Sequence, residues 1–287
     1  MFYAGGHQLD SKTLALFVAA SGASLLGLLD DLKGLSSRTR LLGYSILSLG
    51  FMSFVRYSET MAQADETTTL TGLVFLTSAL WITWGINFFN FMDGINGIAA
   101  VQALVSFGAY ALYNDLSSSG LFALLIVSFA ATAGFLPSNF PKARIFMGDS
   151  GSVLLGFLSV GAPLLFTSGK TEFSLLLRWA SLAPFFFDST ATLIRRVYLG
   201  EKWTDGHNTH SYQILAKKWG SHVGVTALYG AGAILCSTWQ LIGEVGIKQR
   251  WLFIMCSFFG AVFCIWLIKL QLDLVWKTRW QKKAVGQ

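Results

Sequence analysis

The sequence predicts an all-α, polytopic integral membrane protein that crosses the bilayer about nine times. Hydrophobic residues make up 53% of its 287 residues and charged residues only 13%, which is too apolar for a soluble domain. Apolar stretches close to the roughly 20 residues that span a bilayer recur along the chain. We therefore expect a single transmembrane domain over residues 1–287.

Nine apolar segments define the expected spans, and the lysines and arginines between them predict the orientation. Cytoplasmic loops of membrane proteins carry an excess of these cations. Placing the 30–39 loop inside puts fourteen lysines and arginines on the cytoplasmic face and six on the outer face. The expected spans are 13–29, 40–55, 70–88, 98–113, 121–136, 151–167, 174–193, 223–243 and 251–270. The expected cytoplasmic catalytic loops are 30–39, 88–97, 137–150 and 194–222.

Five aspartates lie at or inside the edges of these apolar segments. An ionised carboxylate at the middle of a bilayer costs about 2.5–3.5 kcal/mol, so such groups face a polar site rather than lipid. All but Asp188 stand in Gly- or Asn-containing sequence, which indicates a divalent cation and a phosphate-bearing substrate. Asp188 fits a structural ion pair as well as it fits a site. The five are Asp30, Asp31, Asp93, Asp149 and Asp188.

The first motif, LLDDLKG, places Asp30 and Asp31 at the end of the first expected span. Adjacent residues on a helix point about 100° apart, so the two carboxylates can serve different partners. The helix macrodipole disfavours acidic residues at a helix C-terminus, so their presence here indicates a functional role for this pair. A solvated helix end is the alternative.

The second motif, NFFNFMDGING, repeats polar residues every three positions at Asn87, Asn90, Asp93 and Asn96. With this spacing the four side chains lie in a stripe along one side of a helix end. Its amide and carboxylate groups suit Mg²⁺ and ribose or base recognition. A polar contact between helices is the alternative.

Two further motifs lie in later expected loops. In IFMGDSGS, Asp149 stands at a helix start beside backbone N–H groups that can receive an anion, and simple capping is the alternative. Downstream, His207 and His210 together with Arg195 and Arg196 suit a diphosphate. Two histidines without a third close ligand make a weak zinc signal, and a solvated loop pair is the alternative.

Taken in order, LLDDLKG, NFFNFMDGINGIA, IFMGDSGSVLLG and HNTHSYQ resemble the motifs of the polyprenyl-phosphate N-acetylhexosamine-1-phosphate transferase superfamily. Its members start bacterial O-antigen, enterobacterial common-antigen and peptidoglycan synthesis. The resemblance covers about residues 20–215. HNTHSYQ is more similar to the O-antigen-initiating branch than to the peptidoglycan branch, whose comparable loop carries an HHH run.

This resemblance implies transfer of a sugar 1-phosphate from a UDP-N-acetyl sugar to undecaprenyl phosphate, with release of UMP, at the cytoplasmic face of a bacterial inner membrane. It implies dependence on Mg²⁺, with Mn²⁺ as the alternative ion. Asp30 and Asp31 would engage the lipid phosphate and the metal, one of them as a base. Asp149 would be the main metal ligand, with Asp93 in the same region. The implied substrate-binding residues are Asn87, Asn90, Asn96, Arg195, Arg196, His207 and His210.

Two departures from the family pattern stand out. Position 96 is Asn, where many members carry a second Asp. Members typically have ten or eleven spans and an early basic, Pro/Gly-rich loop, which is absent before Gly5 and Gly6. We therefore expect this chain to lack about two amino-terminal spans of the family.

Three other interpretations stay open. An ion-coupled transporter would place acids at mid-span, whereas these cluster at one membrane face. A CDP-alcohol transferase would carry Ala-Arg shortly after Asp-Gly, where this chain has Ile95-Asn96-Gly97. A non-catalytic relative is the third. No basic, aromatic-interleaved patch indicates nucleic-acid binding, and a homo-oligomer is compatible with the sequence.

Overall fold

The structure, a computed structural model, is built from α-helices with two short 3₁₀ turns, and the described part of the chain contains no β-strand. Its architecture therefore matches the all-α expectation. The described residues are 10–62, 68–112, 120–166, 177–202, 208–241 and 247–284.

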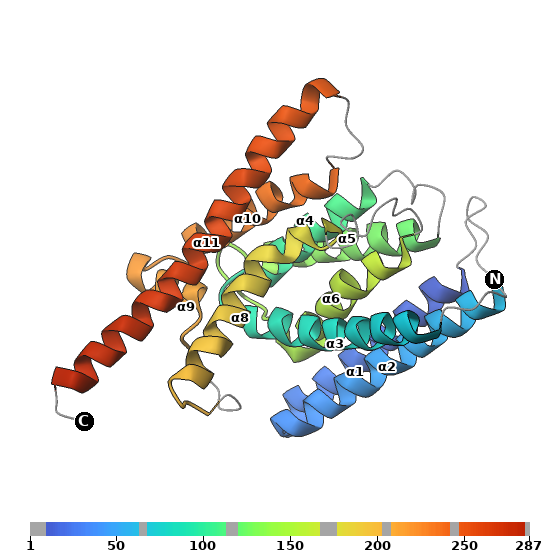
Figure 1. The fold of residues 1–287 in the computed structure, drawn as a ribbon, viewed down its shortest axis with the longest axis horizontal. Coiled ribbons are helices and arrows are strands. Elements are labelled where there is room, and N and C mark those ends of the chain that lie inside the picture. Colours follow the sequence, from blue (N-terminus) through green and yellow to red (C-terminus); the bar gives the residue numbers. More distant parts are fainter. Residues whose placement is uncertain are drawn as a thin grey trace.

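Helices α1 (Ser11–Lys33) and α2 (Ser37–Ala62) form an antiparallel pair and lie side by side in Figure 1. Gly34 ends α1 in the left-handed conformation (φ 65°), which a residue without Cβ adopts readily, and the chain reverses there. A methyl group at Gly43 would overlap Leu26, so the absence of a side chain there permits the close approach of the two helices.

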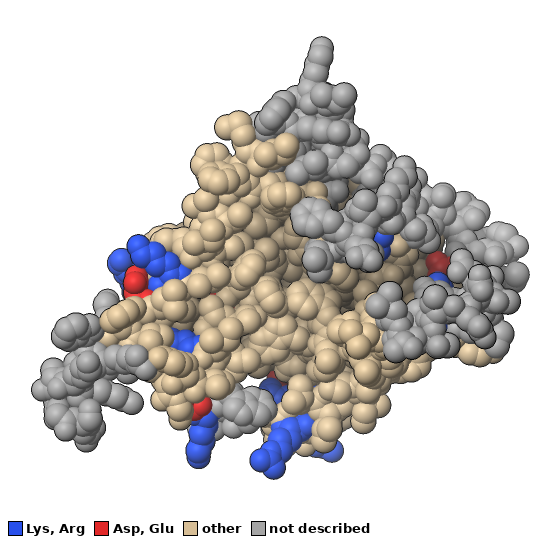
Figure 2. Space-filling view, viewed as in Figure 1, with Lys and Arg blue, Asp and Glu red and all other residues tan. Residues whose placement is uncertain are grey.

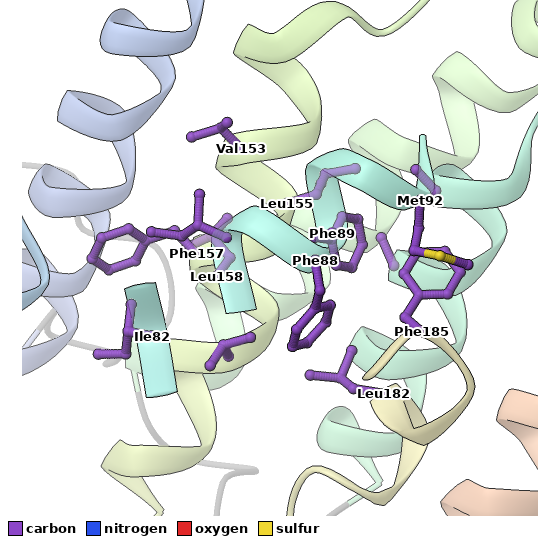
Figure 3. Packing of buried hydrophobic residues seen from close by; sticks show 14 of the residues in the cluster. Ile82, Phe88, Phe89, Met92, Val153, Leu155, Phe157, Leu158, Leu182 and Phe185 are labelled. Atoms are coloured by element: carbon purple, nitrogen blue, oxygen red, sulfur yellow. The ribbon is translucent and has the colours of Figure 1, made fainter. Parts of the chain in front are cut away.

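Helix α6 (Gly148–Gly161) packs between α1 and α3 (Thr68–Met92) and forms the centre of the molecule. Figure 3 shows Phe89 of α3 beside Leu155 of α6, and Ile82 of α3 on the side of Phe157 and Leu158. A Cβ at Gly156 would lie 2.8 Å from the Cβ of Phe89, so only glycine allows this approach. Helices within a bilayer associate through such close packing of small residues, which fixes α6 relative to α3.

The remaining helices surround this centre. Helix α4 packs on α5 and α10, while α8 packs on α3 and on the long helix α11, which crosses the molecule in Figure 1. Their bounds are Ile98–Ala111 (α4), Gly120–Asn139 (α5), Ala162–Leu165 (η2), Ala180–Leu182 (η3), Ala183–Tyr198 (α8), Ser211–Trp219 (α9), His222–Leu241 (α10) and Ile247–Ala284 (α11).

The expected count of nine spans is not supported. Among the described residues, five helical segments are long and apolar enough to cross a membrane, and α4 is a shorter apolar helix. The five are Ser11–Lys33, Gly72–Met92, Gly120–Asn139, Gly148–Leu165 and Ile254–Trp276. This composition and the helical fold support an integral membrane protein.

Two expected boundaries also differ from the structure. The expected span 174–193 is interrupted, because α8 begins only at Ala183, with Pro184 in its first turn, where proline starts helices well. The expected loop 194–222 contains the end of α8 and the whole of α9. Both differences arise because helix boundaries depend on local sequence, such as Pro184, whereas mean hydropathy is averaged over a long window.

On the face shown in Figure 2, most of the visible charged side chains lie near the edges of the molecule. In Figure 2, Lys and Arg on the visible face lie mainly along its lower and left edges, while the broad centre is almost free of charge. The same side in Figure 1 carries the end of α1, the start of α2, the end of α8, and α9. The end of α1, which bears Asp30 and Asp31, therefore lies at this side.

Candidate active site

Three helices bring the first three motifs into one polar cluster. Asp30 comes from the last turn of α1 and Asp149 from the first turn of α6. Arg40, in the first turns of α2, joins them: its Nη1 lies 2.7 Å from Asp30 Oδ2 and 3.3 Å from Asp149 Oδ2. Carboxylates that are 119 positions apart in sequence thus share one cation.

Asn90 of α3 completes this cluster. Its Nδ2 donates to Asp149 Oδ1 (2.9 Å) and to Ser152 Oγ (3.0 Å). The three-residue stripe expected from sequence therefore delivers one of its amides directly to the Asp149 carboxylate. Asp149 receives hydrogen bonds from α2 and α3 on its two oxygens, which fixes the direction of both.

Asp31 caps helix α6 from the neighbouring helix. Its carboxylate accepts hydrogen bonds from the backbone N–H groups of Asp149 (3.1 Å) and Ser150 (3.2 Å). These N–H groups have no partner within the helix, and a negative charge there is stabilised by the helix dipole. The anion that the sequence places at this helix start is thus Asp31, while the Asp149 side chain remains directed into the cluster.

The close contact between α1 and α6 yields a testable prediction at Gly27. A Cβ there would lie 2.6 Å from the carbonyl oxygen of Asp149 and 2.9 Å from the nitrogen of Ser150, so the backbone of α6 must shift. A misplacement of about 1 Å at a catalytic group costs about a hundredfold in rate, and we expect Gly27→Ala to lose that much activity. Gly50→Ala on α2, where a Cβ meets nothing within 4 Å, is the matched control. Equal initial rates for the two variants would contradict this packing argument.

Asp93 lies half-buried just after α3, and its carboxyl group is electrostatically coupled to Asp149. Burial, followed by the negative charge of Asp149, raises the pKa of Asp93 to about 7. Near neutral pH this group is therefore poised between its protonated and ionised forms.

This raised pKa predicts a pH dependence of stability in protein stripped of divalent ions. Between about pH 4 and 7 the folded chain keeps a proton on Asp93 that the unfolded chain has released, so this stabilisation is lost as the pH rises through 7. We expect the free energy of unfolding to fall by about 1 kcal/mol from pH 6 to pH 8. Asp93→Asn, which mimics the protonated form, should remove this part of the slope in thermal unfolding curves. An unchanged slope in the variant would refute it.

The other two amides of the stripe lie outside the cluster of carboxylates. Asn87 Nδ2 donates to the carbonyl oxygen of Thr83 one turn earlier in its own helix (2.7 Å). Asn96 Nδ2 donates to the carbonyl oxygen of Pro141 (3.0 Å), and its Oδ1 lies 3.1 Å from His222 Nδ1. Asn96 therefore ties the loop after α3 to α10, and its substrate-binding role stays a prediction.

The fourth motif is anchored by Asp188, which is fully buried in α8. Its carboxylate accepts from the backbone N–H groups of Ser211 (2.7 Å) and Tyr212 (3.0 Å) and from the hydroxyl of Tyr229 (2.5 Å). It thereby caps the N-terminus of α9. Of the two alternatives that the sequence left open for Asp188, this geometry corresponds to a structural anchor, paired with N–H and O–H donors rather than with a cation.

His210 stands immediately before α9 and is buried beside Asp188, with 3.9 Å between its Nδ1 and Asp188 Oδ1. Burial, together with the positive charges of Arg195 and Arg196, lowers the pKa of His210 to about 3. The imidazole is therefore neutral at physiological pH in the protein without a bound anion, and a phosphate contact by His210 stays a prediction. His207 lies outside the described residues.

The two arginines of α8 are buried and bound within the protein. Arg195 Nη2 donates to Thr209 Oγ1 (2.7 Å), and Arg196 Nη2 donates to the carbonyl oxygen of Lys202 (2.6 Å). Arg196 also pairs with Glu201 at 3.2 Å. These contacts tie α8 to residues that lie between it and α9. A phosphate contact by either arginine stays a prediction.

The two carboxylates of this cluster suit a divalent cation whose remaining ligands come from water and a phosphate-bearing substrate. Within the described residues, no three His, Cys, Asp or Glu side chains form a ready-made metal cage. Magnesium in phosphate-handling sites usually takes only one or two protein carboxylates, with water and phosphate oxygens completing its octahedron. Asp30 and Asp149 already hold one cation, the guanidinium of Arg40, between them. The donor set therefore matches a site that the phosphates of a substrate complete.

Three participants were not predicted as site residues from sequence. Arg40 was counted only among the cytoplasmic cations, although its place shortly after the Asp-Asp pair was a usable signal. Ser152 lies one helical turn after Gly148 and Asp149, and Tyr229 lies in the middle of an apolar helix. Tyr229 carries no local signal, because its contact with Asp188 joins residues 41 positions apart.

The fold and the cluster define a polytopic α-helical membrane protein with an acidic polar site at one end of its helices. The chain belongs to glycosyl transferase family 4, whose model matches residues 13–167. This stretch contains Asp30, Arg40, Asn90 and Asp149, and the match confirms the resemblance drawn from the motifs.

Individual relatives agree with this membership. Over 274 residues the chain is 28% identical to a probable undecaprenyl-phosphate N-acetylglucosaminyl 1-phosphate transferase of Bacillus subtilis, covering 91% of this chain and 73% of the relative. It is 27% identical to an undecaprenyl-phosphate alpha-N-acetylglucosaminyl 1-phosphate transferase of Thermotoga maritima, covering 85% and 72%. A decaprenyl-phosphate N-acetylglucosaminephosphotransferase of Mycobacterium leprae is 28% identical, with 78% and 62% covered.

Proposed function

We propose that this protein transfers an N-acetylhexosamine 1-phosphate from a UDP-sugar to undecaprenyl phosphate, releasing UMP, at the cytoplasmic face of a bacterial inner membrane. The product would begin the synthesis of a cell-surface polysaccharide such as O-antigen. The observation that carries this proposal is the meeting of Asp30 and Asp149 around one cation, with Asn90 of a third helix donating to Asp149. The names of the three relatives support the same reaction class.

The reaction that fits this cluster joins two phosphates. An oxygen of the lipid phosphate attacks the sugar-bearing phosphorus of the UDP-sugar, and the bond from that phosphorus to the bridging oxygen breaks. UMP leaves with that oxygen, and the new lipid-linked diphosphate keeps the sugar. Such transfers depend mainly on alignment of the two anions and neutralisation of their charge.

The exposure and hydrogen-bond partners of the aspartates assign metal binding and proton transfer to different residues. Asp149, with both oxygens directed into the cluster, is the main ligand for Mg²⁺ or Mn²⁺, and Asp93 lies in the same region. The bound ion would neutralise phosphate charge. Asp31 is exposed and retains free acceptor capacity, so it is better placed than the buried Asp30 to take a proton from the lipid phosphate.

Apolar cavities beside α8 suit the isoprenoid tail of the acceptor. One of about 520 Å³ lies between α3 and α8, and a second of about 540 Å³ lies between α8 and α11. Phe186 and Phe187 line both, and Arg195 lines the second. A hydrocarbon chain in these cavities would be held by burial of apolar surface, with its charged head at the polar end of the helices.

A donor panel tests this proposal. Purified protein is incubated with undecaprenyl phosphate, Mg²⁺ and each of several UDP-N-acetyl sugars, and UMP release and a lipid-linked sugar product are measured together. We expect one donor to give both products in equal amounts, and chelation of the metal to stop both. No product from any donor, while a full-length homologue is active in the same assay, would overturn the proposal and favour a non-catalytic relative.

A further inference from the structure

The guanidinium of Arg40 occupies the space between Asp30 and Asp149. Its Nη1 atom makes both contacts, at 2.7 Å to Asp30 Oδ2 and 3.3 Å to Asp149 Oδ2. These are the oxygens that a divalent cation shared by the two carboxylates would need. A guanidinium and a divalent ion cannot hold the same oxygens at the same time, because both are positively charged.

The polar contacts of the Arg40 side chain are made by its guanidinium. About a quarter of the side chain is exposed (27%), and among the described residues the guanidinium also contacts Ser37 Oγ, at a long 3.5 Å. Asp30 has a second partner, the backbone N–H of Leu35 at 2.6 Å, and Asp149 has Asn90. Both carboxylates therefore keep a neutral hydrogen-bond donor when the guanidinium leaves.

We propose that Arg40 is a cationic placeholder, which neutralises Asp30 and Asp149 in the metal-free protein and must be displaced when a divalent cation binds. The inference rests on the proposed function, because it assumes that these carboxylates take a metal. It goes further by making Arg40 a competitor of that metal. The competition lowers the affinity of the empty site for metal and favours binding of the ion together with the anionic donor, whose phosphates can pair with the displaced guanidinium.

A placeholder and a scaffold predict opposite effects of removing Arg40. If Arg40 only positioned the two carboxylates, its loss would let them drift apart, and metal affinity would fall. If it competes with the metal, its loss leaves two uncompensated carboxylates, and affinity rises. One charge at this distance is worth a few kcal/mol even at a surface-like dielectric, so an effect of tenfold or more is expected.

The test is Mn²⁺ binding to the full chain in lipid nanodiscs without substrate, measured from the electron paramagnetic resonance signal of free Mn²⁺. We expect Arg40→Met to tighten binding about tenfold or more. Arg40→Lys, which keeps the positive charge on a shorter side chain with a single point donor, should tighten it less. Arg38→Met is the matched control, because Arg38 is exposed on the same helix, and it should bind as the native protein does.

The outcomes separate failure of this inference from failure of the proposed function. Unchanged or weaker binding in Arg40→Met, with measurable binding in the native protein, would overturn the placeholder and leave the metal site standing. No binding in any variant, with or without a UDP-sugar, would overturn the metal site and the placeholder together. The tightening should vanish when Asp149→Asn is added to Arg40→Met, and persistence there would place the metal elsewhere and overturn the inference.

Discussion

Asp149→Asn should lower the transfer rate at least about a thousandfold while leaving the helices packed as they are. The amide has nearly the same shape and keeps an oxygen to accept from Asn90 Nδ2. It loses the negative charge that faces Arg40 and, by our proposal, the metal. Loss of one preorganised electrostatic contact typically costs 10²–10³ in turnover, and loss of the main metal ligand removes more than one.

This result is measured as the initial rate of UMP release at saturating Mg²⁺, for preparations matched in monodispersity. Asp273→Asn on α11 is the matched control, since Asp273 is exposed and far along the chain from the motifs. It should retain native activity. A rate above about a tenth of native for Asp149→Asn would show that another group is the principal ligand.

Asp188→Leu should give the largest loss of stability among the aspartate variants. Asp188 is fully buried and accepts hydrogen bonds from Ser211, Tyr212 and Tyr229. Leucine has the same branched shape, with two larger methyl groups and no acceptor, so two backbone N–H groups and one hydroxyl are left buried without this partner. Each such group costs about 1–3 kcal/mol, so the variant should lose at least about 3 kcal/mol.

Thermal unfolding in detergent, followed by the fraction of monodisperse protein, measures this loss. Asp273→Leu is the control and should unfold close to the native temperature, because its side chain is exposed. Asp188→Asn keeps one acceptor oxygen and should fall between the two. A native-like unfolding temperature for Asp188→Leu would contradict the role of Asp188 as the anchor of α9.

The convergence of the first three motifs could be predicted from sequence because each lies at a helix end. Once hydropathy places the helices and the cationic loops orient them, Asp30, Asp93 and Asp149 fall on one side without any knowledge of packing. The meeting of Asp30 and Asp149 at Arg40 agrees with that prediction. The count of nine spans is not supported, since five helical segments of the described residues are long and apolar enough to cross a membrane. Two boundaries also differ, because α8 starts late and the expected loop before α10 contains α9.

Contacts between helices could not be predicted, because hydropathy says nothing about which faces meet. Arg40 reaches Asp30 because Gly34 adopts a left-handed turn, and it reaches Asp149 because Gly27 allows α6 to approach α1. Asp188 finds its partners 23 to 41 residues away on α9 and α10. Both sets of contacts depend on the rotation of one helix against another, which a single sequence leaves undetermined.

The most direct test of the central claim asks whether a divalent ion binds at Asp149 against the phosphates of a sugar nucleotide. Electron–nuclear double resonance of Mn²⁺ bound to the protein, with UDP-N-acetylglucosamine and related donors, reports phosphorus atoms in the first coordination sphere. We predict a strong ³¹P coupling with the accepted donor, which disappears in Asp149→Asn. A bound ion without ³¹P coupling for every donor, or a coupling that Asp149→Asn leaves unchanged, would contradict the account.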